Sequence, residues 1–425
     1  MSQTPQLLFK NRKAGETVFM PEYRASGGYQ GLEKALRTMT PQDIRELVKA
    51  AGLRGRGGAG FPTGVKWGFF PADAPGVKYL VCNCDEMEPG TYKDGVLLQA
   101  DPHQLVEGMI LSAFALQTQV GYIFIRYAYE RQASNLRKAI SEATAAGYLG
   151  KNILGSGFDF ELHVHGSAGR YILGEETALL NGLEGIRPNP RLKPPFPATR
   201  GLFGRPTTVN NVETLANIPH IVMGGAQWFK DLAMTTDGSG TKLFGLSGHL
   251  NCTECFELPV GIPLREVIET YGQGMWRNKQ FKACLPGGAS TPYLTGEHLD
   301  VPLDFGTLEK VGSRFGTAGV TAFDEDTCMV AATLNLIRFF ARESCGWCTP
   351  CRDGLNLVKW LLEQFESGTG TSDHLLMLKE QLRNISGNSF CALAEGAMGP
   401  VAGLLAHFEQ EIVDHIDQGR CPFHR

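Results

Sequence analysis

Three closely spaced cysteines are the residues of this sequence best suited to bind a metal cofactor. The run CGWCTPC places Cys345, Cys348 and Cys351 within seven residues. Thiolates at this spacing can ligate three corners of one iron-sulfur cluster, whereas structural zinc usually takes two separated pairs. A fourth ligand has to come from elsewhere, and the spacing leaves Cys391 and Cys421 open as candidates. We therefore expect an iron-sulfur cluster in the C-terminal part of the chain.

A glycine-rich run, RGRGGAGFPTGVKW, is a second candidate site. Its residues Gly55, Gly57 and Gly60 satisfy the pattern G-x-G-x-x-G, but a helix is predicted before it, where the dinucleotide fingerprint requires a strand. Backbone amides together with the cations Arg56 and Lys66 suit a phosphate group. The alternative is a glycine-rich surface turn without a ligand.

Polar clusters recur further along the chain. They comprise Asn83, Asp85, Glu86 and Glu88 after a predicted strand, Gly174, Glu175 and Glu176 at a helix start, and Asn210 with Asn211. Acceptors and amides of this kind suit ribityl and ribose hydroxyl groups. The carboxylates leave a metal site, an acid-base pair or a solvated turn without function as alternatives. Since no histidine is close in sequence, a transition-metal site is disfavoured.

The elements that must position these residues alternate between helix and strand. Thr40 and Pro41 begin a helix that we expect to end near Ala51, and YLVC, GYIFIRY and the helical runs between and after them predict an open α/β sheet. The segment DGSG near residues 237–240 is typical of a linker. Short strands and one helix follow to about residue 326, and the pattern is helical from there on.

The composition of the 425 residues is that of a globular protein, with 43% hydrophobic and 20% charged residues. The net charge of -4 predicts no nucleic-acid partner. No secretory signal is recognisable at the N-terminus, and the apolar stretch 109–125 is interrupted by polar residues, so we expect a buried helix and strand there, not a membrane span. Eleven cysteines in a cytoplasmic protein point to metal or redox roles.

Six motifs in this order resemble one family: RGRGGAGFPTGVKW, NCDEMEPGTYKD, GRYILGEETALL, RLKPPFPA, TTVNNVETL and ESCGWCTPCRDG. Together they are similar to the NADH-binding flavoprotein subunit of NADH-quinone oxidoreductase, respiratory complex I. The resemblance implies hydride transfer from NADH to FMN, then single-electron transfer to one 4Fe-4S cluster and onward to quinone. No catalytic acid or base is needed for this chemistry.

The resemblance also implies an architecture and partners. It predicts a Rossmann-like α/β FMN-binding domain over residues 1–240, a ubiquitin-like α+β domain (β-grasp, SLBB-type) over 241–326, and a helical bundle that carries the cluster over 327–425. The implied partners are a thioredoxin-like 2Fe-2S subunit and a large multi-cluster iron-sulfur subunit. The protein would then be cytoplasmic, in a peripheral arm on the inner face of the cell membrane, and would touch the membrane only indirectly.

Specific residues carry these implied roles. The FMN site would comprise Gly55, Arg56, Gly57, Gly58, Gly60, Lys66, Asn83, Asp85, Glu88, Tyr171, Gly174, Glu175, Glu176, Val209, Asn210 and Asn211. NADH would contact Phe61, Phe69, Glu88, Glu176, Lys193 and Phe196. At least one of the three phenylalanines could instead be an ordinary core residue. The family's cluster ligands match Cys345, Cys348, Cys351 and Cys391, which favours Cys391 over Cys421.

Two other functions are compatible with these residues. One is a diaphorase subunit of an NAD-linked hydrogenase or formate dehydrogenase; we expect it less, because no further CxxCxxC run is present. The other is a non-enzymatic scaffold held by zinc. Cys84, Cys252 and Cys255 depart from the family pattern, and we leave them outside the site.

Overall fold

The computed structural model describes residues 5–423, and its internal contacts divide the chain into two compact units. Unit 1 extends up to Met87 and includes Tyr92–Phe244 and Cys255–Ile262. Unit 2 contains Glu88–Thr91, Gly245–Glu254 and the chain from Pro263 onward. The three-part division at residues 240 and 326 stays a prediction.

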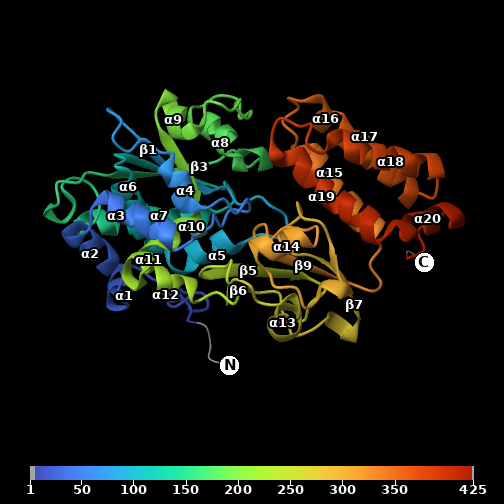
Figure 1. The fold of residues 1–425 in the computed structure, drawn as a ribbon, viewed down its shortest axis with the longest axis horizontal. Coiled ribbons are helices and arrows are strands. Elements are labelled where there is room, and N and C mark those ends of the chain that lie inside the picture. The colour runs from blue at the N-terminus through green and yellow to red at the C-terminus, as the bar shows by residue number, and fades with distance from the viewer. Residues whose placement is uncertain (1–4, 424–425) are drawn as a thin grey trace. The chain divides into compact units, whose positions relative to one another are not determined.

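A four-stranded parallel sheet organises unit 1 (Figure 1). Its strands are β1 (Tyr79–Cys84), β2 (Val120–Ile125), β3 (Glu161–Gly166) and β4 (Thr207–Asn211), in the order β3-β2-β1-β4. From β1 the chain proceeds outward to β2 and β3, and it then returns to place β4 on the other side of β1. This reversal creates a switch point between the carboxyl ends of β1 and β4, where open α/β sheets bind their ligands. The Rossmann-like prediction is thereby confirmed.

The helix α6 (Pro102–Leu116) packs against this sheet and is buried along nearly its whole length. Gln117, with a φ of 54°, ends it, and β2 follows three residues later. The apolar stretch 109–125 is therefore a buried helix followed by a strand, as predicted. The predicted helix after Thr40 is α3 (Pro41–Ala50), and Thr40 and Asp43 form its capping box.

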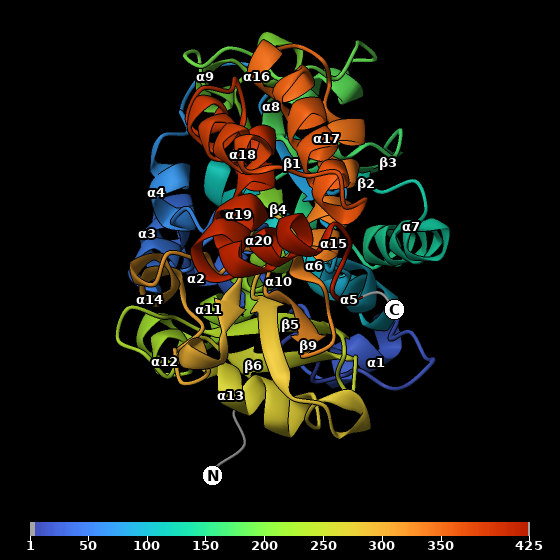
Figure 2. The same ribbon diagram turned by 90° about the vertical axis from the view of Figure 1, so that its right-hand side faces the viewer.

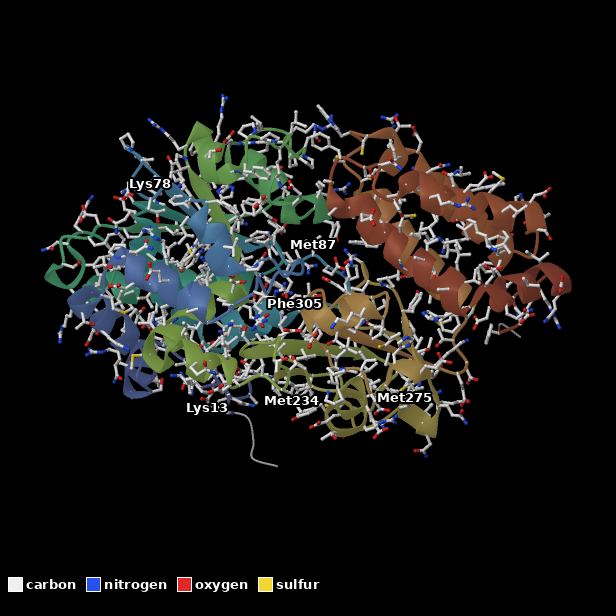
Figure 3. The ribbon with its side chains drawn as sticks, viewed as in Figure 1. Lys13, Lys78, Met87, Met234, Met275 and Phe305 are labelled. Atoms are coloured by element: carbon white, nitrogen blue, oxygen red, sulfur yellow. The ribbon has the colours of Figure 1, made fainter. Side chains whose placement is uncertain are left out.

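A second long helix of unit 1, α7 (Glu130–Ala145), has a buried face of alanine and leucine. The remaining helices of unit 1 are shorter. They are α1 (Met20–Ala25), α2 (Gln30–Thr38), α4 (Thr63–Gly68), α5 (Lys93–Ala100), α8 (Glu176–Leu183), α9 (Pro197–Arg200), α10 (Val212–Ala216), α11 (Ile218–Gly224) and α12 (Ala226–Lys230). Single 3-10 turns lie at η1 (Ile153–Gly155), η2 (Tyr171–Gly174) and η3 (Leu202–Gly204). Buried Lys78 donates from its ammonium group to the carbonyl oxygens of Ala72 and Ala74, which holds the loop before β1 (Figure 3).

A second sheet has the strand order β6-β5-β9-β7-β8. Its strands are β5 (Thr241–Gly248), β6 (Cys255–Pro259), β7 (Phe281–Leu285), β8 (Leu294–Thr295) and β9 (Gly319–Asp324). β9 pairs in parallel with the second half of β5 and antiparallel with β7. The accompanying helices are α13 (Leu264–Glu266), continued by the π turn η4 (Val267–Tyr271), the 3-10 turns η5 (Trp276–Asn278) and η6 (Gly296–His298), and α14 (Phe305–Lys310). Mixed strands with few helices confirm an α+β pattern here, while the ubiquitin-like topology stays a prediction.

The C-terminal part of unit 2 is helical, as predicted (Figure 2). It comprises α15 (Met329–Glu343), α16 (Thr349–Arg352), α17 (Gly354–Glu366), α18 (Ser372–Ile385), α19 (Ala392–His407) and α20 (Glu409–Gln418). α15 packs on both α17 and α19, and α18 lies against the same two helices. Within residues 5–423, none of the helices has the length and apolar character that crossing a bilayer requires.

Candidate functional site

The glycine-rich loop lies at the switch point of the parallel sheet. It connects α3 to α4, so a helix precedes it, as predicted. The backbone amide of Arg56 donates to Thr214 Oγ1 at 2.8 Å. Gly57 approaches the end of β4 so closely that a β-carbon on it would lie 3.1 Å from the Asn211 β-carbon. The sequence of the loop is therefore matched to a close approach of backbone to the strand end.

Arg56 does not present its guanidinium to solvent. The side chain is buried, and its Nη2 donates to the carbonyl oxygen of Ser239 at 2.7 Å. Burial lowers the pKa of Arg56 to about 10, although Glu213 opposes this change. Ser239 Oγ also donates to the carbonyl oxygen of Gly52. The predicted DGSG linker is thus fastened to the glycine-rich loop, and Arg56 acts as its anchor.

Four side chains of opposite charge meet beside this loop, and we call Lys66, Glu175, Glu176 and Lys193 the charged cluster. Lys66 Nζ lies 3.0 Å from Glu176 Oε2, and Lys193 Nζ lies 2.8 Å from Glu176 Oε1 and 3.1 Å from Glu175 Oε1. Burial raises the pKa of Glu176, but the two lysines outweigh it and bring the pKa to about 2. All four side chains keep between 20% and 33% of their surface exposed, so a ligand can reach them.

Polar groups at the end of β1 face the segment before α8. Asn83 Nδ2 donates to the carbonyl oxygen of Gly174 at 2.9 Å, and Ser167 Oγ donates to Asp85 Oδ1 at 2.7 Å. The second carboxylate oxygen of Asp85 is buried and has no hydrogen-bond partner among the described residues. Burial raises the pKa of Asp85 to about 6, against the effect of Ser167. A buried acceptor without a partner fits a ligand hydroxyl group, such as one of the ribityl chain of FMN.

The end of β4 is fixed by its neighbours. Lys66 Nζ donates to the carbonyl oxygen of Val209 at 2.8 Å, and Trp67 Nε1 donates to Asn210 Oδ1 at 3.0 Å. Asn211 Nδ2 donates to Asp94 Oδ2 at 2.7 Å. The structure therefore brings the predicted residues of β4 together with the glycine-rich loop and the charged cluster. Tyr171, at the start of η2, is half-buried.

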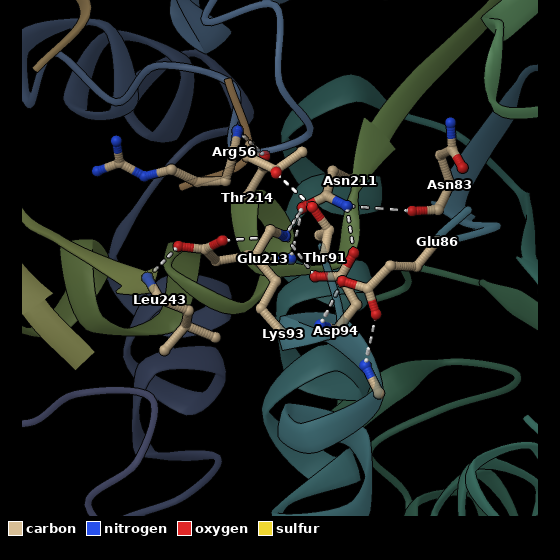
Figure 4. A network of polar contacts seen from close by, with 12 residues as sticks. Arg56, Asn83, Glu86, Thr91, Lys93, Asp94, Asn211, Glu213, Thr214 and Leu243 are labelled. Carbon is tan, nitrogen blue, oxygen red and sulfur yellow. Dashed lines mark hydrogen bonds and ion pairs between the residues drawn. The ribbon is translucent and has the colours of Figure 1, made fainter. Parts of the chain in front are cut away.

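A buried network of charged side chains contacts Asn211 (Figure 4), and its charged members were not among the residues predicted from the sequence. Lys93 Nζ lies 2.6 Å from Asp94 Oδ1 and 3.0 Å from Glu213 Oε2, and Lys242 Nζ lies 2.6 Å from the same Glu213 oxygen. Lys93 Nζ also donates to Asn211 Oδ1. Lys93 and Asp94 belong to the motif NCDEMEPGTYKD, and Glu213 belongs to TTVNNVETL. Their position in these motifs could have identified them as candidate site residues.

Arg191 is a second residue that the sequence did not single out. Its backbone amide donates to Thr177 Oγ1, its Nε donates to Asn181 Oδ1, and its Nη2 lies 2.9 Å from Glu184 Oε2. These contacts hold the proline-rich loop on α8. They thereby place Lys193, two residues further on, in the charged cluster.

The three predicted aromatic contacts are all exposed. Phe61 is 50%, Phe69 65% and Phe196 57% accessible, so the alternative that at least one is a core residue is wrong. Phe61 belongs to the glycine-rich loop, and Phe69 follows α4 directly. Exposed rings of this size are available to stack on a planar ligand.

Glu88 is assigned to a different compact unit from the other residues predicted for the flavin and NADH sites. It belongs to unit 2, where its Oε1 accepts a hydrogen bond from the backbone amide of Ser290 at 2.7 Å. Its assignment to the flavin or NADH site stays a prediction.

The predicted cluster ligands converge within unit 2. Cys345 follows α15, Cys348 and Cys391 are the N-caps of α16 and α19, and Cys351 lies within α16. Burial, together with the nearby thiols of Cys348, Cys391 and Cys345, raises the pKa of Cys351 to about 12, against the effect of a hydrogen bond with Ser344. Four cysteines that are not in disulfides, three of them close enough to affect the pKa of Cys351, form a donor set that fits an iron-sulfur cluster. Cys421 does not take part, and it lies close to Cys328 instead.

Comparisons with known proteins agree with this geometry. Residues 48–220 match the family model of the Nuo51 FMN-binding domain, and residues 331–415 match that of the NADH-ubiquinone oxidoreductase-F iron-sulfur binding region. The chain is 51% identical to the F subunit of NADH-quinone oxidoreductase from Escherichia coli (strain K12), over 98% of this chain and 94% of that one. It is 48% identical to the F 2 subunit of the same enzyme from Rhizobium meliloti (strain 1021), over 98% of this chain and 99% of that one.

A solved structure is similar over nearly the whole chain. It is that of an NAD+-reducing [NiFe]-hydrogenase in the H2-reduced state, with a TM-score of 0.83 and 35% identity, over 96% of this chain and 68% of that one. The two family models give this chain one FMN-binding region and one iron-sulfur binding region, and the sequence relatives are named as F subunits of NADH-quinone oxidoreductase. The chain therefore belongs to the family of the F subunits of NADH-quinone oxidoreductase, oxidoreductases of NADH that carry FMN and a 4Fe-4S cluster.

Proposed function

We propose that this chain oxidises NADH at the switch point of its parallel sheet and passes the electrons out through the four cysteines of unit 2. When bound, FMN accepts a hydride from NADH, and the 4Fe-4S cluster takes the electrons onward one at a time. One observation carries the proposal. The glycine-rich loop, the buried Asp85 oxygen without a hydrogen-bond partner and the charged cluster all lie at the carboxyl ends of the parallel strands. The protein supplies alignment and electrostatics, so no acid or base is required.

The FMN phosphate would be held by the backbone amides of Gly57, Gly58 and Gly60 and by Lys66, since the amide of Gly55 donates to the carbonyl oxygen of Phe61. Asn83, Asp85, Asn210 and Asn211, with the backbone of Gly174 and Val209, would bond the ribityl chain and the ring system. Arg56 would serve as an anchor of the loop, because its amide donates to Thr214 and its guanidinium donates to Ser239.

NADH would lie against the exposed rings of Phe61, Phe69 and Phe196. Lys193 and Glu176 would bond its polar groups, and the ammonium of Lys193 would also lower the electrostatic cost of a polyanionic ligand. The ion pairs within the charged cluster keep these side chains in place before the ligand arrives.

The direct test uses the purified full chain. Flavin released by acid is expected to be FMN at about one per chain, and anaerobic NADH is expected to bleach its visible absorption. A matched variant, Asp85→Ala, is expected to lose FMN, because the buried acceptor disappears. Wild-type protein that retains no flavin, or flavin that NADH leaves oxidised, would contradict the proposal.

Replacement of Glu176 by glutamine is expected to raise the KM for NADH roughly tenfold, a loss of about 1.4 kcal/mol. The change removes the negative charge that orients Lys66 and Lys193. Steady-state kinetics with ferricyanide as acceptor measures it, and half-exposed Glu161→Gln is the control. An unchanged KM would remove Glu176 from the NADH site.

The same ion pairs predict the pH dependence of stability. The pKa of Glu176 is about 2 in the folded chain and 4.5 in the absence of partners, so the pairs stabilise the fold above pH 4.5. Their contribution is lost as the pH falls through about 2. Acid unfolding of Glu176→Gln, followed by circular dichroism, should therefore be less steep in this range than that of wild type.

Glu88→Ala is expected to weaken NADH oxidation while FMN is retained. Because Glu88 also accepts from the Ser290 amide, Glu88→Gln serves as a control that keeps an acceptor but removes the charge. A charge-dependent role in NADH binding requires both variants to be impaired. Normal kinetics in both would remove Glu88 from the site.

The partners proposed for this chain are a thioredoxin-like 2Fe-2S subunit and a large multi-cluster iron-sulfur subunit, in a peripheral arm on the inner face of the cell membrane. The structural likeness to the hydrogenase favours a second candidate function, a diaphorase subunit. Co-purification from native membranes separates the two: quinone-reductase subunits support the first, and hydrogenase subunits support the second. We retain the ubiquitin-like topology of residues 241–326 as part of the proposal.

A further inference from the structure

A second group of metal-binding side chains lies in unit 2, apart from the four cysteines of the proposed cluster. It consists of Cys328, Glu366, His415 and Cys421, and their ligand atoms all lie within 4.8 Å of one another. Three of these residues are buried, and the Glu366 side chain is 16% exposed. We propose that these four residues bind one zinc ion.

Three of the distances within the group are near those of a tetrahedral zinc site, and two of them are slightly shorter. Cys328 Sγ lies 2.9 Å from Glu366 Oε1 and 3.5 Å from His415 Nε2, and His415 Nε2 lies 3.2 Å from Glu366 Oε1. Zinc with bonds of about 2.0–2.3 Å separates its ligand atoms by roughly 3.3–3.8 Å. A cation at the centre therefore requires only small side-chain movements.

The tautomer of His415 is set by its own helix. Its Nδ1 lies 2.6 Å from the carbonyl oxygen of Glu411. Because a carbonyl oxygen can only accept, Nδ1 carries the proton, and the lone pair of the neutral ring is on Nε2, the atom that faces Cys328 and Glu366. A hydrogen bond of this kind to a backbone carbonyl is the usual support of a metal-bound histidine.

The backbone also favours the site at two places. Cys328 is the N-cap of α15, and its sulfur accepts from the Ala331 amide at 3.3 Å, a hydrogen bond that a metal-bound sulfur would keep. Gly368 has a φ of 74°, and a β-carbon on it would lie 2.0 Å from the carbonyl oxygen of Gly419. Only glycine permits this contact, which brings the end of α17 with Glu366 to the segment that carries Cys421.

The donor set selects the metal. Two thiolates, one imidazole and one carboxylate are ligand types that zinc binds, and four of them complete its tetrahedral coordination, whereas hard cations such as Mg²⁺ and Ca²⁺ prefer oxygen. The ion would link the start of α15 (Cys328), the end of α17 (Glu366) and α20 (His415). Cys328 also borders a cavity of about 820 Å³ within unit 2, which gives the cation a route to the site.

Two metal-free states compete with this proposal. In one, Cys328 and Cys421 form a disulfide. In the other, His415 is protonated and pairs with Glu366: burial lowers the pKa of His415, but the hydrogen bonds to Glu366 and Glu411 bring it to about 9. Neither state contains zinc, so the measured zinc content of the protein distinguishes both of them from the proposed site.

The test is metal analysis of the full chain purified with its flavin and iron-sulfur cluster from zinc-supplied cells. We expect about one zinc per chain in wild type and at least a tenfold decrease in Cys421→Ala. Cys284→Ala is the matched control, because Cys284 is buried in β7 away from the group. Cys391→Ala is expected to keep its zinc while it loses iron, which separates this site from the cluster.

Glu366→Gln provides a variant that preserves side-chain size, and it should also lose zinc. Cobalt(II) added to zinc-free wild type should give the ligand-field absorption of a tetrahedral thiolate site, and the band should be absent in Cys421→Ala. Unchanged zinc in Cys421→Ala would overturn the proposal. So would a wild type that binds neither zinc nor cobalt, or a Cys328–Cys421 disulfide found by mass spectrometry.

Discussion

Replacement of Cys391 by alanine is expected to reduce the iron content from about four atoms per chain to nearly none. The structure gathers Cys391 with Cys345 and Cys348 around buried Cys351, so its loss leaves a cluster of four irons with three protein ligands. Reduction of FMN by NADH should persist, while electron transfer to quinone in the assembled complex should stop. Iron analysis and the low-temperature electron paramagnetic resonance spectrum of the reduced protein measure the change.

Cys421→Ala is the control for this experiment, since it removes the other cysteine that sequence spacing left open. It is expected to keep its iron, because Cys421 lies with Cys328, Glu366 and His415. Equal iron contents in the two variants would refute the assignment of Cys391 as the fourth ligand.

Replacement of Glu213 by glutamine is expected to lower the free energy of unfolding of unit 1 by about 3–5 kcal/mol. Glu213 is fully buried between Lys93 and Lys242, and its loss leaves two buried cations with too few partners. Burial already lowers the pKa of Lys242 to about 8 in spite of Glu213. The destabilisation should therefore shrink as the pH rises and Lys242 releases its proton.

Chemical denaturation measures this effect, with Glu161→Gln expected to differ from wild type by less than about 0.5 kcal/mol. FMN affinity should fall together with stability, because the network of Glu213 also holds Asn211 through Lys93. A Glu213→Gln protein as stable as wild type would show that the buried charges are compensated by another route.

Much of the fold was accessible from local patterns. The capping residues of α3, the helix and strand within residues 109–125, and the helical character beyond residue 327 depend on neighbours in sequence, and all three predictions are confirmed. The exposure of Phe61, Phe69 and Phe196 was not accessible in this way. Whether a ring is buried depends on segments that approach it from elsewhere in the chain.

The candidate site shows the same limit. Arg56 was predicted as a cation for phosphate, but its guanidinium bonds to Ser239, 183 residues later in the sequence. The partners of Glu213, Lys93 and Lys242, are likewise outside its own stretch of sequence, 120 residues before it and 29 residues after it. Cys328, which has no close cysteine neighbour in sequence, was not considered as a ligand.

By itself the sequence predicted the chemistry of this protein: three cysteines in seven residues favour an iron-sulfur cluster over zinc, and the resemblance of the long motifs implies flavin and NADH. The three cysteines lie within one or two turns of backbone, so the covalent geometry of the chain keeps their thiols close together. Only the tertiary structure showed that Cys421 lies with Cys328, Glu366 and His415, whereas Cys391 lies near Cys351, as the resemblance implies. Cys391 lies 40 residues after Cys351 and Cys421 lies 93 residues after Cys328, so helix packing, not spacing, decides which thiols meet.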